Sequence, residues 1–217
     1  MSEALAEGLR EGVRALALDL SEETQRQLLA YMALIQKWTR VYNLTAVRDP
    51  QEMLTHHLLD SLSAVTPLLR HTDGQPVRLL DVGSGGGLPG VVLAICRPEI
   101  QVTCVDTVGK KAAFIQQVAA TLRLPNLRGL HARVETVQDK YDVVCSRAFA
   151  SLTDFTSWSF SALAEGGVWM AMKGKMPTDE IAQLPPETEL FHMEPLAVPG
   201  LDAERCMLWL RPRRESL

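Results

Sequence analysis

The sequence predicts an α/β fold, in which a helical N-terminal extension precedes a mostly parallel sheet with an antiparallel C-terminal edge strand. From Val77 onwards, short apolar runs alternate with stretches of helical periodicity, the pattern of a parallel sheet covered by helices on both faces. Before that point, apolar residues recur at helical spacing. A chain of 217 residues is long enough for one full core. We therefore expect a helical extension over residues 1–75 and one compact core over residues 76–217.

Two helices are expected within the extension. Ser21 is a favourable N-cap, and the two glutamates after it complement the helix dipole. The apolar residues that follow at helical spacing are Leu28, Met32, Ile35, Trp38 and Tyr42. The run Asp49-Pro50-Gln51-Glu52 is a second start signal, with a capping Asp, Pro at the first helical position and Glu three residues after the cap. We expect this second helix to continue towards Leu69, before a turn-forming linker over residues 71–76.

Five short apolar runs mark the expected parallel strands. They span residues 77–82, 100–106, 127–132, 141–146 and 167–172. Two further strands are expected over residues 189–198 and 204–211, with a turn at residues 199–202 between them. Because strands joined by a short turn pair antiparallel, this pair predicts an antiparallel edge on the sheet.

Composition argues against several classes of protein. The formal charge of −4 and the pI near 5.8 are atypical of a free-standing nucleic-acid binder, so contact with a nucleic acid would need a local basic patch. The start Met-Ser-Glu-Ala lacks the plan of a signal peptide, and no apolar run approaches the ~20 residues of a membrane span. The four cysteines share no CxxC spacing, and the five histidines are scattered. We expect a cytoplasmic protein with reduced thiols, no metal site and no membrane partner.

A glycine-rich loop identifies the expected ligand site. Residues 78–96 read RLLDVGSGGGLPGVVLAIC, with five glycines between Gly83 and Gly90 directly after a strand. In an open α/β sheet, the turn after the first strand is the usual ligand crevice, and Asp106 closes the neighbouring strand. A carboxylate at that position accepts hydrogen bonds from both hydroxyls of a ribose, which favours a ligand that contains adenosine.

Asp81 distinguishes between two adenosine cofactors. The spacing Gly85-x-Gly87-x-x-Gly90 fits the dinucleotide fingerprint of a NAD site, but that motif alone is weak. A pyrophosphate on the helix N-terminus would lie close to the Asp81 carboxylate, and like charges at ~4 Å oppose each other strongly in a partly desolvated site. S-adenosylmethionine carries an ammonium and a sulfonium instead, for which Asp81 is a counter-ion. We therefore predict a methyl donor, and the alternative is a solvated turn in which Asp81 only caps the helix.

The glycine loop and several further motifs resemble one enzyme family. The string Asp81-Val-Gly-Ser-Gly-Gly-Gly-Leu-Pro-Gly90 resembles motif I of the class I methyltransferases, which have a Rossmann-like sheet. Other similar motifs are Tyr42-Asn43-Leu44-Thr45, His57-Leu-Leu-Asp60-Ser61-Leu62, Ser146-Arg147-Ala148, Lys173-Gly174 and Glu204-Arg205. In this order the set resembles the glucose-inhibited division protein B family, the bacterial 16S ribosomal RNA guanine-N7 methyltransferases. The resemblance implies methylation of N7 of a guanine in the 530 loop of 16S rRNA, within the small ribosomal subunit.

The resemblance also implies roles for individual residues. The candidate cofactor-binding residues are Asp81, Gly83, Gly85, Leu88, Asp106, Val134, Glu135 and Arg147. Among them, the glycine loop would lie beside the methionine part, Asp106 would hold the ribose, and Val134 and Glu135 would meet the adenine. Arg147, beside cofactor and substrate, and Arg205, near the sheet edge, are the candidate catalytic residues.

The implied reaction needs alignment rather than a general base. N7 of guanine has an exposed lone pair and no proton, and holding it about 3–3.5 Å from the methyl carbon can supply roughly 7–11 kcal/mol. No Asn/Asp-Pro-Pro-aromatic motif follows the fourth strand, which argues against an exocyclic amine as the target. Cys145 lacks the preceding Pro of cysteine-dependent base methyltransferases, so we interpret it as a core thiol. His57, Asp60 and Ser61 share one helix face, and we expect this polar cluster to satisfy itself while packing the helices over the crevice.

Several basic residues are candidate contacts for RNA phosphates. They are Lys110, Lys111, Arg123, Arg128, Arg133, Arg211, Arg213 and Arg214. Because the chain is acidic overall, we expect it to recognise a shaped ribosomal particle rather than naked RNA, and we expect a monomer. Three other functions stay open: a class I methyltransferase for a small molecule or a protein, a NAD-dependent oxidoreductase, and a nucleotide-sensing module without catalysis.

Overall fold

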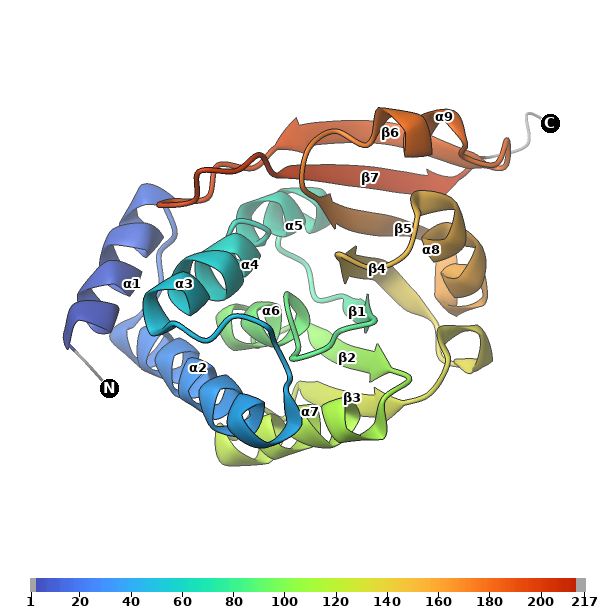
Figure 1. Cartoon of the computed structure of the whole chain (residues 1–217). Helices are drawn as coiled ribbons and strands as arrows, with labels where there is room; N and C mark the ends of the chain where they lie inside the picture. Colours follow the sequence, from blue (N-terminus) through green and yellow to red (C-terminus); the bar gives the residue numbers. More distant parts are fainter. Residues whose placement is uncertain (1–2, 214–217) are drawn as a thin grey trace.

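A seven-stranded sheet runs through the centre of the structure in the order β3-β2-β1-β4-β5-β7-β6 (Figure 1). The strands are β1 (Arg78–Val82), β2 (Gln101–Asp106), β3 (Leu127–His131), β4 (Tyr141–Arg147), β5 (Leu163–Lys173), β6 (Thr188–Pro195) and β7 (Cys206–Pro212). The computed structural model describes residues 3–213, so Arg214 lies outside the described residues. Strands β1 to β5 pair in parallel, and β7 pairs antiparallel with both β5 and β6. The predicted α/β class, the five parallel strands and the antiparallel C-terminal pair are confirmed.

The last strand of the chain lies inside the sheet, and β6 forms its edge. The residues of β7 from Cys206 to Leu210 are all buried, whereas β6 is largely part-exposed. An apolar run without a polar face needs cover on both sides, which the inner position provides. Strand β5 begins at Leu163, earlier than the run at 167–172 that predicted it.

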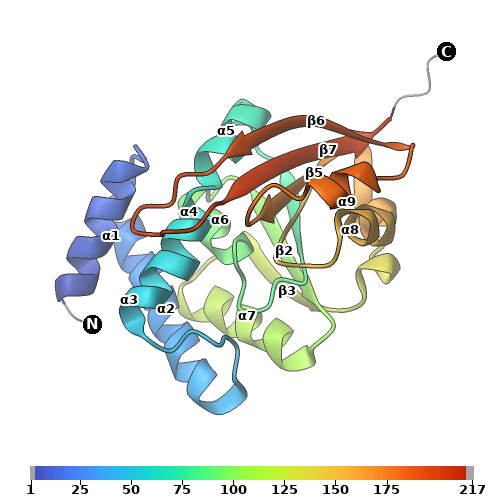
Figure 2. The same cartoon turned by 45° about the horizontal axis from the view of Figure 1, so that its top comes forward.

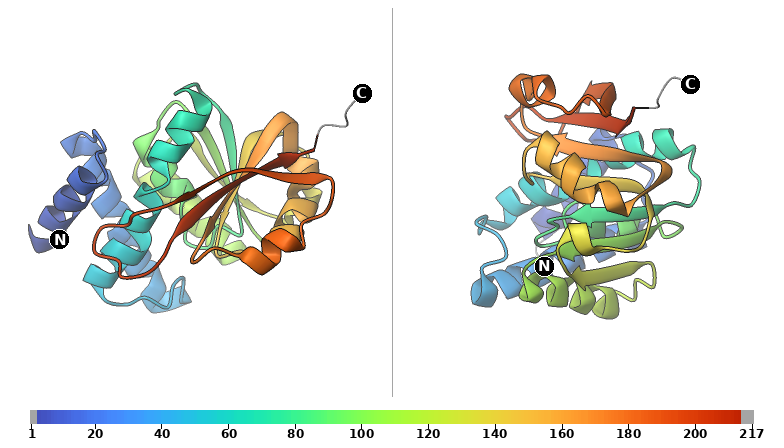
Figure 3. Two further views of the ribbon diagram at one scale, coloured as in Figure 1. Left: turned by 90° about the horizontal axis from the view of Figure 1, so that it is seen from above. Right: turned by 90° about the vertical axis from the view of Figure 1, so that its right-hand side faces the viewer.

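Helices cover both faces of the sheet (Figure 3). On one face, α6 (Gly90–Cys96) and α7 (Gly109–Thr121) share a hydrophobic cluster with Leu79. On the other face, α8 (Leu152–Ser159) and the 3₁₀ segments η2 (Val134–Thr136) and η3 (Phe160–Ala162) share a cluster with Leu80. Since side chains alternate along a strand, consecutive leucines of β1 anchor the two halves of the core.

The N-terminal extension lies against α6 and α7 (Figures 1 and 2). It comprises α1 (Glu3–Ala15), α2 (Glu22–Tyr42), α3 (Pro50–Met53), the π-helical segment η1 (Leu54–Leu59), α4 (Asp60–Leu62) and α5 (Val65–Thr72). Both predicted N-caps are confirmed, because the Ser21 hydroxyl accepts from the amide of Thr24 and the Asp49 carboxylate accepts from two amides. Leu28 and Met32 of α2 belong to the same buried cluster as α6 and α7. The extension therefore shares its core with the sheet.

The prediction of one continuous helix from Asp49 towards Leu69 is wrong. A π-helical segment interrupts it at residues 54–59, and the chain restarts as α5 at Val65. Pro67 explains the restart, because it has no N–H to bond to the carbonyl of Ser63 and fits only the first turn of a new helix. Within residues 3–213, no helix is both long enough and apolar enough to cross a membrane.

Close packing of α1 against η1 gives a test of the extension. A Cβ on Gly12 would overlap the side chain of Leu59, with Leu59 Cγ at 3.2 Å, whereas a Cβ on Gly8 would meet only Leu54 Cδ2 at 2.9 Å. We predict that Gly12→Ala lowers the free energy of unfolding by about 1–3 kcal/mol through overpacking, despite the better helix propensity of Ala. Gly8→Ala is the matched control, with a smaller loss. Urea unfolding checks both, and equal free energies for the two variants would contradict this packing.

Candidate functional site

The carboxyl ends of the parallel strands surround a cavity of about 430 Å³ at the predicted ligand crevice. Its lining includes Gly83, Asp106, Val134, Glu135, Phe149 and Trp158. The first four are predicted cofactor residues, which the fold brings together from three strand ends. The lining does not include Asp81, Gly85, Leu88 or Arg147. This volume falls within the range of small-molecule sites, about 300–1,000 Å³.

The glycine loop after β1 forms one wall of the site. Gly83 has φ +64°, and a Cβ there would overlap the ring of Phe149, so the position suits glycine alone. The amide of Gly83 donates to the carbonyl of Val105 at 2.9 Å. From α2, the buried hydroxyl of Tyr31 donates to the carbonyl of Gly86 at 2.5 Å. The loop is thus held from the sheet and from the N-terminal extension.

Asp81 is fully buried at the end of β1. Its Oδ2 accepts from the amide of Gly90 at 2.8 Å, but its Oδ1 is buried without a hydrogen-bond partner among the described residues. Burial raises the pKa of Asp81 to about 7, against opposing effects of the Gly90 amide and the charge of Arg147. An unpartnered buried carboxylate oxygen is unfavourable, and a cationic ligand group would relieve it. This oxygen fits the ammonium of S-adenosylmethionine and disfavours the pyrophosphate of a dinucleotide.

Asp106 lies at the carboxyl end of β2, where it faces the cavity. Its two oxygens accept from the amides of Gly85 at 3.0 Å and Val108 at 2.9 Å. These amides belong to the glycine loop and to the N-cap of α7. They fix the carboxylate at the position where a ribose would meet it.

The two candidate catalytic arginines meet at Asp60. Arg147 ends β4 and places Nη1 2.7 Å from Asp60 Oδ2, while Arg205, just before β7, places Nε 3.0 Å from Oδ1. Arg147 also donates to the carbonyl of His56 at 2.8 Å, within the π-helical segment. Asp60 is 1% exposed. The extension therefore supplies the group that orients both arginines.

The expectation that His57, Asp60 and Ser61 satisfy one another is wrong. Asp60 binds the two arginines, His57 Nε2 pairs with Thr45 Oγ1 at 2.7 Å, and Ser61 Oγ is buried without a partner in the described part of the chain. A buried carboxylate is better compensated by charged guanidinium groups than by a neutral ring. Burial, and then the charge of Arg147, lower the pKa of His57 to about 4. His57 is therefore neutral at pH 7 and is no general acid there.

Burial supports the interpretation of Cys145 as a core thiol. Cys145 is fully buried, and desolvation raises its pKa well above the ordinary value, so it stays a thiol as expected. Within residues 3–213, no three His, Cys, Asp or Glu side chains are arranged to hold a metal ion.

The candidate phosphate contacts are scattered over the surface. Lys111 and Arg133 line the cavity itself. The ammonium of Lys110 lies over an aromatic ring, 5.0 Å from its centroid. Arg128 and Arg211 are each paired with a carboxylate, at 3.0 and 2.9 Å. The structure thus gathers two of these residues at the site and ties two others to local ion pairs.

Two aromatic residues that form a wall of the cavity, Phe149 and Trp158, are not among the residues predicted from the sequence. The rings of Phe149 and Trp158 meet edge to face, with centroids 6.0 Å apart. Phe149 could have been found, because it directly follows the Ser146-Arg147-Ala148 motif at the carboxyl end of a strand, where ligands bind. Trp158 lies at a helical position that carries no such signal.

Together, the strand order, the crevice beside β1 and β2, and the unpartnered carboxylate define a class I methyltransferase. A solved structure of that class, magnesium protoporphyrin IX methyltransferase (ChlM) from Synechocystis PCC 6803 with bound SAM, has a similar fold. It matches with a TM-score of 0.59 at 14% identity, over 85% of this chain and 97% of that chain. A family model described as GidB, rRNA small subunit methyltransferase G, matches residues 24–208, and the chain belongs to this family.

Curated relatives are similar over nearly their full length. Ribosomal RNA small subunit methyltransferase G of Acidovorax sp. (strain JS42) is 68% identical over 212 residues, which cover 94% of each chain. The protein of the same name from Paracidovorax citrulli (strain AAC00-1) is 64% identical over 224 residues, which cover 98% of this chain and 92% of the relative. The motif resemblance to this family is confirmed.

The buried carboxylate predicts a pH dependence of cofactor affinity. Only ionised Asp81 attracts a cation, and its pKa in the folded protein is raised from 3.8 to about 7. We predict that the affinity for S-adenosylmethionine rises about tenfold per pH unit up to about pH 7 and then levels off. Calorimetric titration between about pH 5.5 and 8.5 checks this, with Asp81→Asn as the variant that removes the slope and weakens binding. A wild-type slope in that variant would contradict the assignment.

The same shift predicts the stability of the cofactor-free protein. Because the folded-state pKa is raised, the stability linked to protonated Asp81 is complete below about pH 4 and is lost as pH rises through about 7. Asp81→Asn keeps an oxygen for the Gly90 amide and places a neutral amide at the unpartnered position. We therefore expect the variant to be more stable than the wild type at pH 8, by about 1–3 kcal/mol. Urea unfolding at pH 5 and pH 8 checks the sign, and a variant less stable at pH 8 would contradict it.

Proposed function

We propose that the protein transfers the methyl group of S-adenosylmethionine to N7 of one guanine in the 530 loop of 16S ribosomal RNA. The match to the family of small-subunit rRNA methyltransferases over residues 24–208 carries the proposal. The unpartnered Asp81 oxygen supports the cationic cofactor. The motif resemblance supports the target atom and the loop.

The predicted cofactor-binding residues, inside and beside the cavity, would each hold one part of the cofactor. Asp81 would accept the ammonium, and Asp106 would accept hydrogen bonds from the ribose hydroxyls. The amide of Val134 and the carboxylate of Glu135, which line the cavity after β3, would meet the adenine edge. Leu88, in the turn before α6, would border the methionine part together with Gly83 and Gly85. S-adenosylmethionine supplies a methyl group activated by a sulfonium.

The protein's contribution to the transfer is alignment. N7 of guanine attacks with its own lone pair, the bonding pair of the broken bond stays on sulfur, and no proton moves. This agrees with His57, whose pKa is lowered to about 4 so that it is a weak base, and with Cys145, which stays a protonated thiol and is no nucleophile. Holding the reacting atoms at about 3–3.5 Å is worth roughly 7–11 kcal/mol.

Arg147 and Arg205 would hold the target nucleotide. Asp60 compensates one of their two charges, so the cluster keeps a net positive charge for a phosphate or for guanine O6. A donor on O6 leaves N7 free to react. The charge of Arg147 also lowers the pKa of Asp81, which supports a role for Arg147 beside the cofactor as well as the substrate.

The arginine pair gives a prediction. Arg205→Lys keeps the positive charge but loses the planar, forked set of guanidinium donors. We therefore expect kcat/KM for ribosomal subunits to fall about 10–100-fold. The affinity for S-adenosylmethionine should change less than about twofold, because the hydrogen bonds of Arg205 go to Asp60 and Glu204 and to none of the predicted cofactor-binding residues. Steady-state methylation and calorimetry check the two halves. A loss of cofactor affinity equal to the loss of kcat/KM would contradict a substrate-side role.

The proposed partner and cellular location follow from the proposed rRNA substrate. We propose that the protein acts as a monomer in the bacterial cytoplasm on the small ribosomal subunit or an assembly intermediate of it, without a metal. The net charge of −4 supports recognition of a shaped particle over naked RNA.

Transfer of a labelled methyl group to unmodified small ribosomal subunits tests the function. We expect label on one guanine, released by N7-specific chain cleavage, and weaker labelling of naked 16S rRNA. Label at another base position would overturn the target atom. Binding of S-adenosylmethionine without RNA label would favour a small-molecule or protein substrate.

A further inference from the structure

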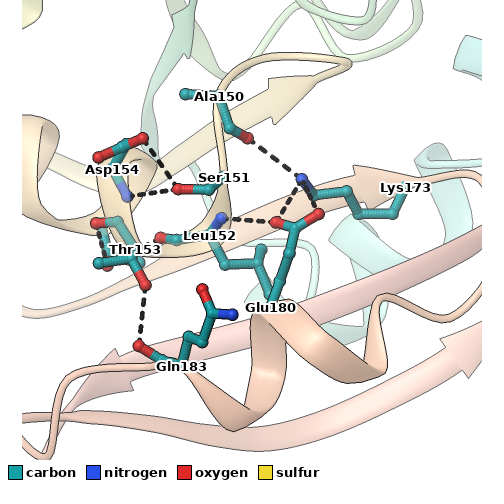
Figure 4. Close-up of polar contacts among 9 residues, drawn as sticks. Ala150, Ser151, Leu152, Thr153, Asp154, Lys173, Glu180 and Gln183 are labelled. Atoms are coloured by element: carbon teal, nitrogen blue, oxygen red, sulfur yellow. Dashed lines mark hydrogen bonds and ion pairs between the residues drawn. The ribbon is translucent and has the colours of Figure 1, made fainter.

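Lys173, at the end of β5, belongs to a motif that the cofactor and arginine sites leave unexplained. Its Nζ donates to the carbonyl of Ala150 at 3.1 Å and to Glu180 at 2.9 and 3.2 Å (Figure 4). Oε2 of Glu180 in turn accepts from the amide of Leu152 at 2.7 Å. The pair therefore binds the loop between β4 and α8 on both sides of Ser151, at the carbonyl of Ala150 and the amide of Leu152. These contacts are called the grip below.

The grip comes from an element outside the site. Glu180 lies on α9 (Thr178–Ala182), the short helix after β5, and the carbonyl of Gln183 accepts from the Thr153 hydroxyl at 3.0 Å. The Lys173 side chain is 15% exposed and that of Glu180 is 33% exposed. A partly desolvated, hydrogen-bonded pair holds its geometry better than a surface pair does.

Starting helix α8 does not require this pair. The Ser151 hydroxyl already caps α8 by accepting from the amide of Asp154, and it also contacts the Asp154 carboxylate at 2.9 Å (Figure 4). Glu180 adds a tie between separate elements at the first residue of the helix. The tie therefore fixes where the loop lies rather than whether the helix forms.

The gripped loop carries groups of the site. It starts at Arg147 and includes Phe149, whose ring packs on Gly83. Between them, Ala148 has φ +50°, a left-handed conformation that a non-glycine residue keeps only where its surroundings hold it. The carbonyl that Lys173 binds belongs to the next residue after Phe149. Release of this grip would let the strained turn relax and the aromatic wall move.

We propose that Lys173 and Glu180 are positioning residues for methyl transfer, which act by holding the loop 148–151 against the glycine loop. The inference rests on the methyltransferase function proposed above. It differs from direct contact of Lys173 with RNA, because it assigns Glu180 an equal part. If Lys173 bound RNA directly, loss of the Glu180 charge would free its ammonium for that contact.

The test compares Glu180→Gln with the wild type in single-turnover methylation of unmodified small ribosomal subunits. We expect the transfer rate to fall about tenfold, equivalent to about 1.4 kcal/mol. The affinity for S-adenosylmethionine should stay within about threefold, because Asp106, Val134 and Glu135 lie outside the gripped loop. Hydrogen exchange of the Leu152 amide should accelerate at least about tenfold, since its acceptor loses charge.

Glu194→Gln is the matched control. Glu194 pairs with Arg70 at 2.6 Å, is 17% exposed and joins β6 to α5 without a contact to the loop. We expect the wild-type transfer rate for this variant. Both variants are assayed well below their measured unfolding midpoints, so that a loss of fold is not read as a loss of rate.

A double-mutant cycle compares the Lys173→Met, Glu180→Gln double variant with the two single variants. A loss of transfer rate in the double variant close to the larger of the two single losses supports one shared role, whereas additive losses would overturn the inference in favour of separate roles. An unchanged rate in Glu180→Gln, or a slower rate with unchanged Leu152 exchange, would also overturn the inference. Absence of transfer by the wild type would instead refute the proposed function, and the exchange measurement would then still report on the grip.

Discussion

The buried carboxylate of Asp60 is the contact on which the arrangement of the site depends. It joins three segments that are distant in the chain: α4 of the extension, the end of β4, and the segment before β7. A buried ion pair that loses one partner leaves an uncompensated charge, at a cost of about 3–5 kcal/mol. The extension is therefore no detachable appendage, because it neutralises charge in the site and shares the core with α6 and α7.

Asp81 shows the opposite situation, because its burial lowers stability and its proposed role is to bind the cofactor. The fold leaves one of its oxygens buried without a partner among residues 3–213, and desolvation raises its pKa to about 7. A ligand that binds only the folded state returns this free energy by mass action. If Asp81 binds the cofactor as proposed, cofactor binding and folding are coupled at this oxygen atom. The adjacent Cys104 and Cys145, paired in register with Asp81, contribute a low-polarity surround that strengthens the effect.

Local patterns sufficed for the strands, the N-caps and the glycine loop, because each depends on neighbouring residues. Gly83, Asp106, Val134 and Glu135 were also predictable, since the carboxyl ends of parallel strands share one edge. The partners of Asp60 were not, because residues at helical spacing suggest contacts along one helix and carry no information about an arginine far along the chain. The break before α5 could be predicted from Pro67, but the start signal at residues 49–52 favoured one continuous helix. Lys173 was visible as part of a motif, whereas Glu180 has meaning only once α9 is folded beside α8.

A common principle connects these contacts. The Tyr31 hydroxyl holds the glycine loop, Asp60 holds the two arginines, and the Lys173–Glu180 pair holds the loop after β4. Each is a polar side chain from a neighbouring element that fixes a strand-end loop. For the proposed nucleophile, which has a free lone pair, no proton has to be moved, so the precision of these loops is what the protein would add to the reaction. The proposed mechanism therefore depends on residues beyond the cavity lining, in the helices that hold its walls in place.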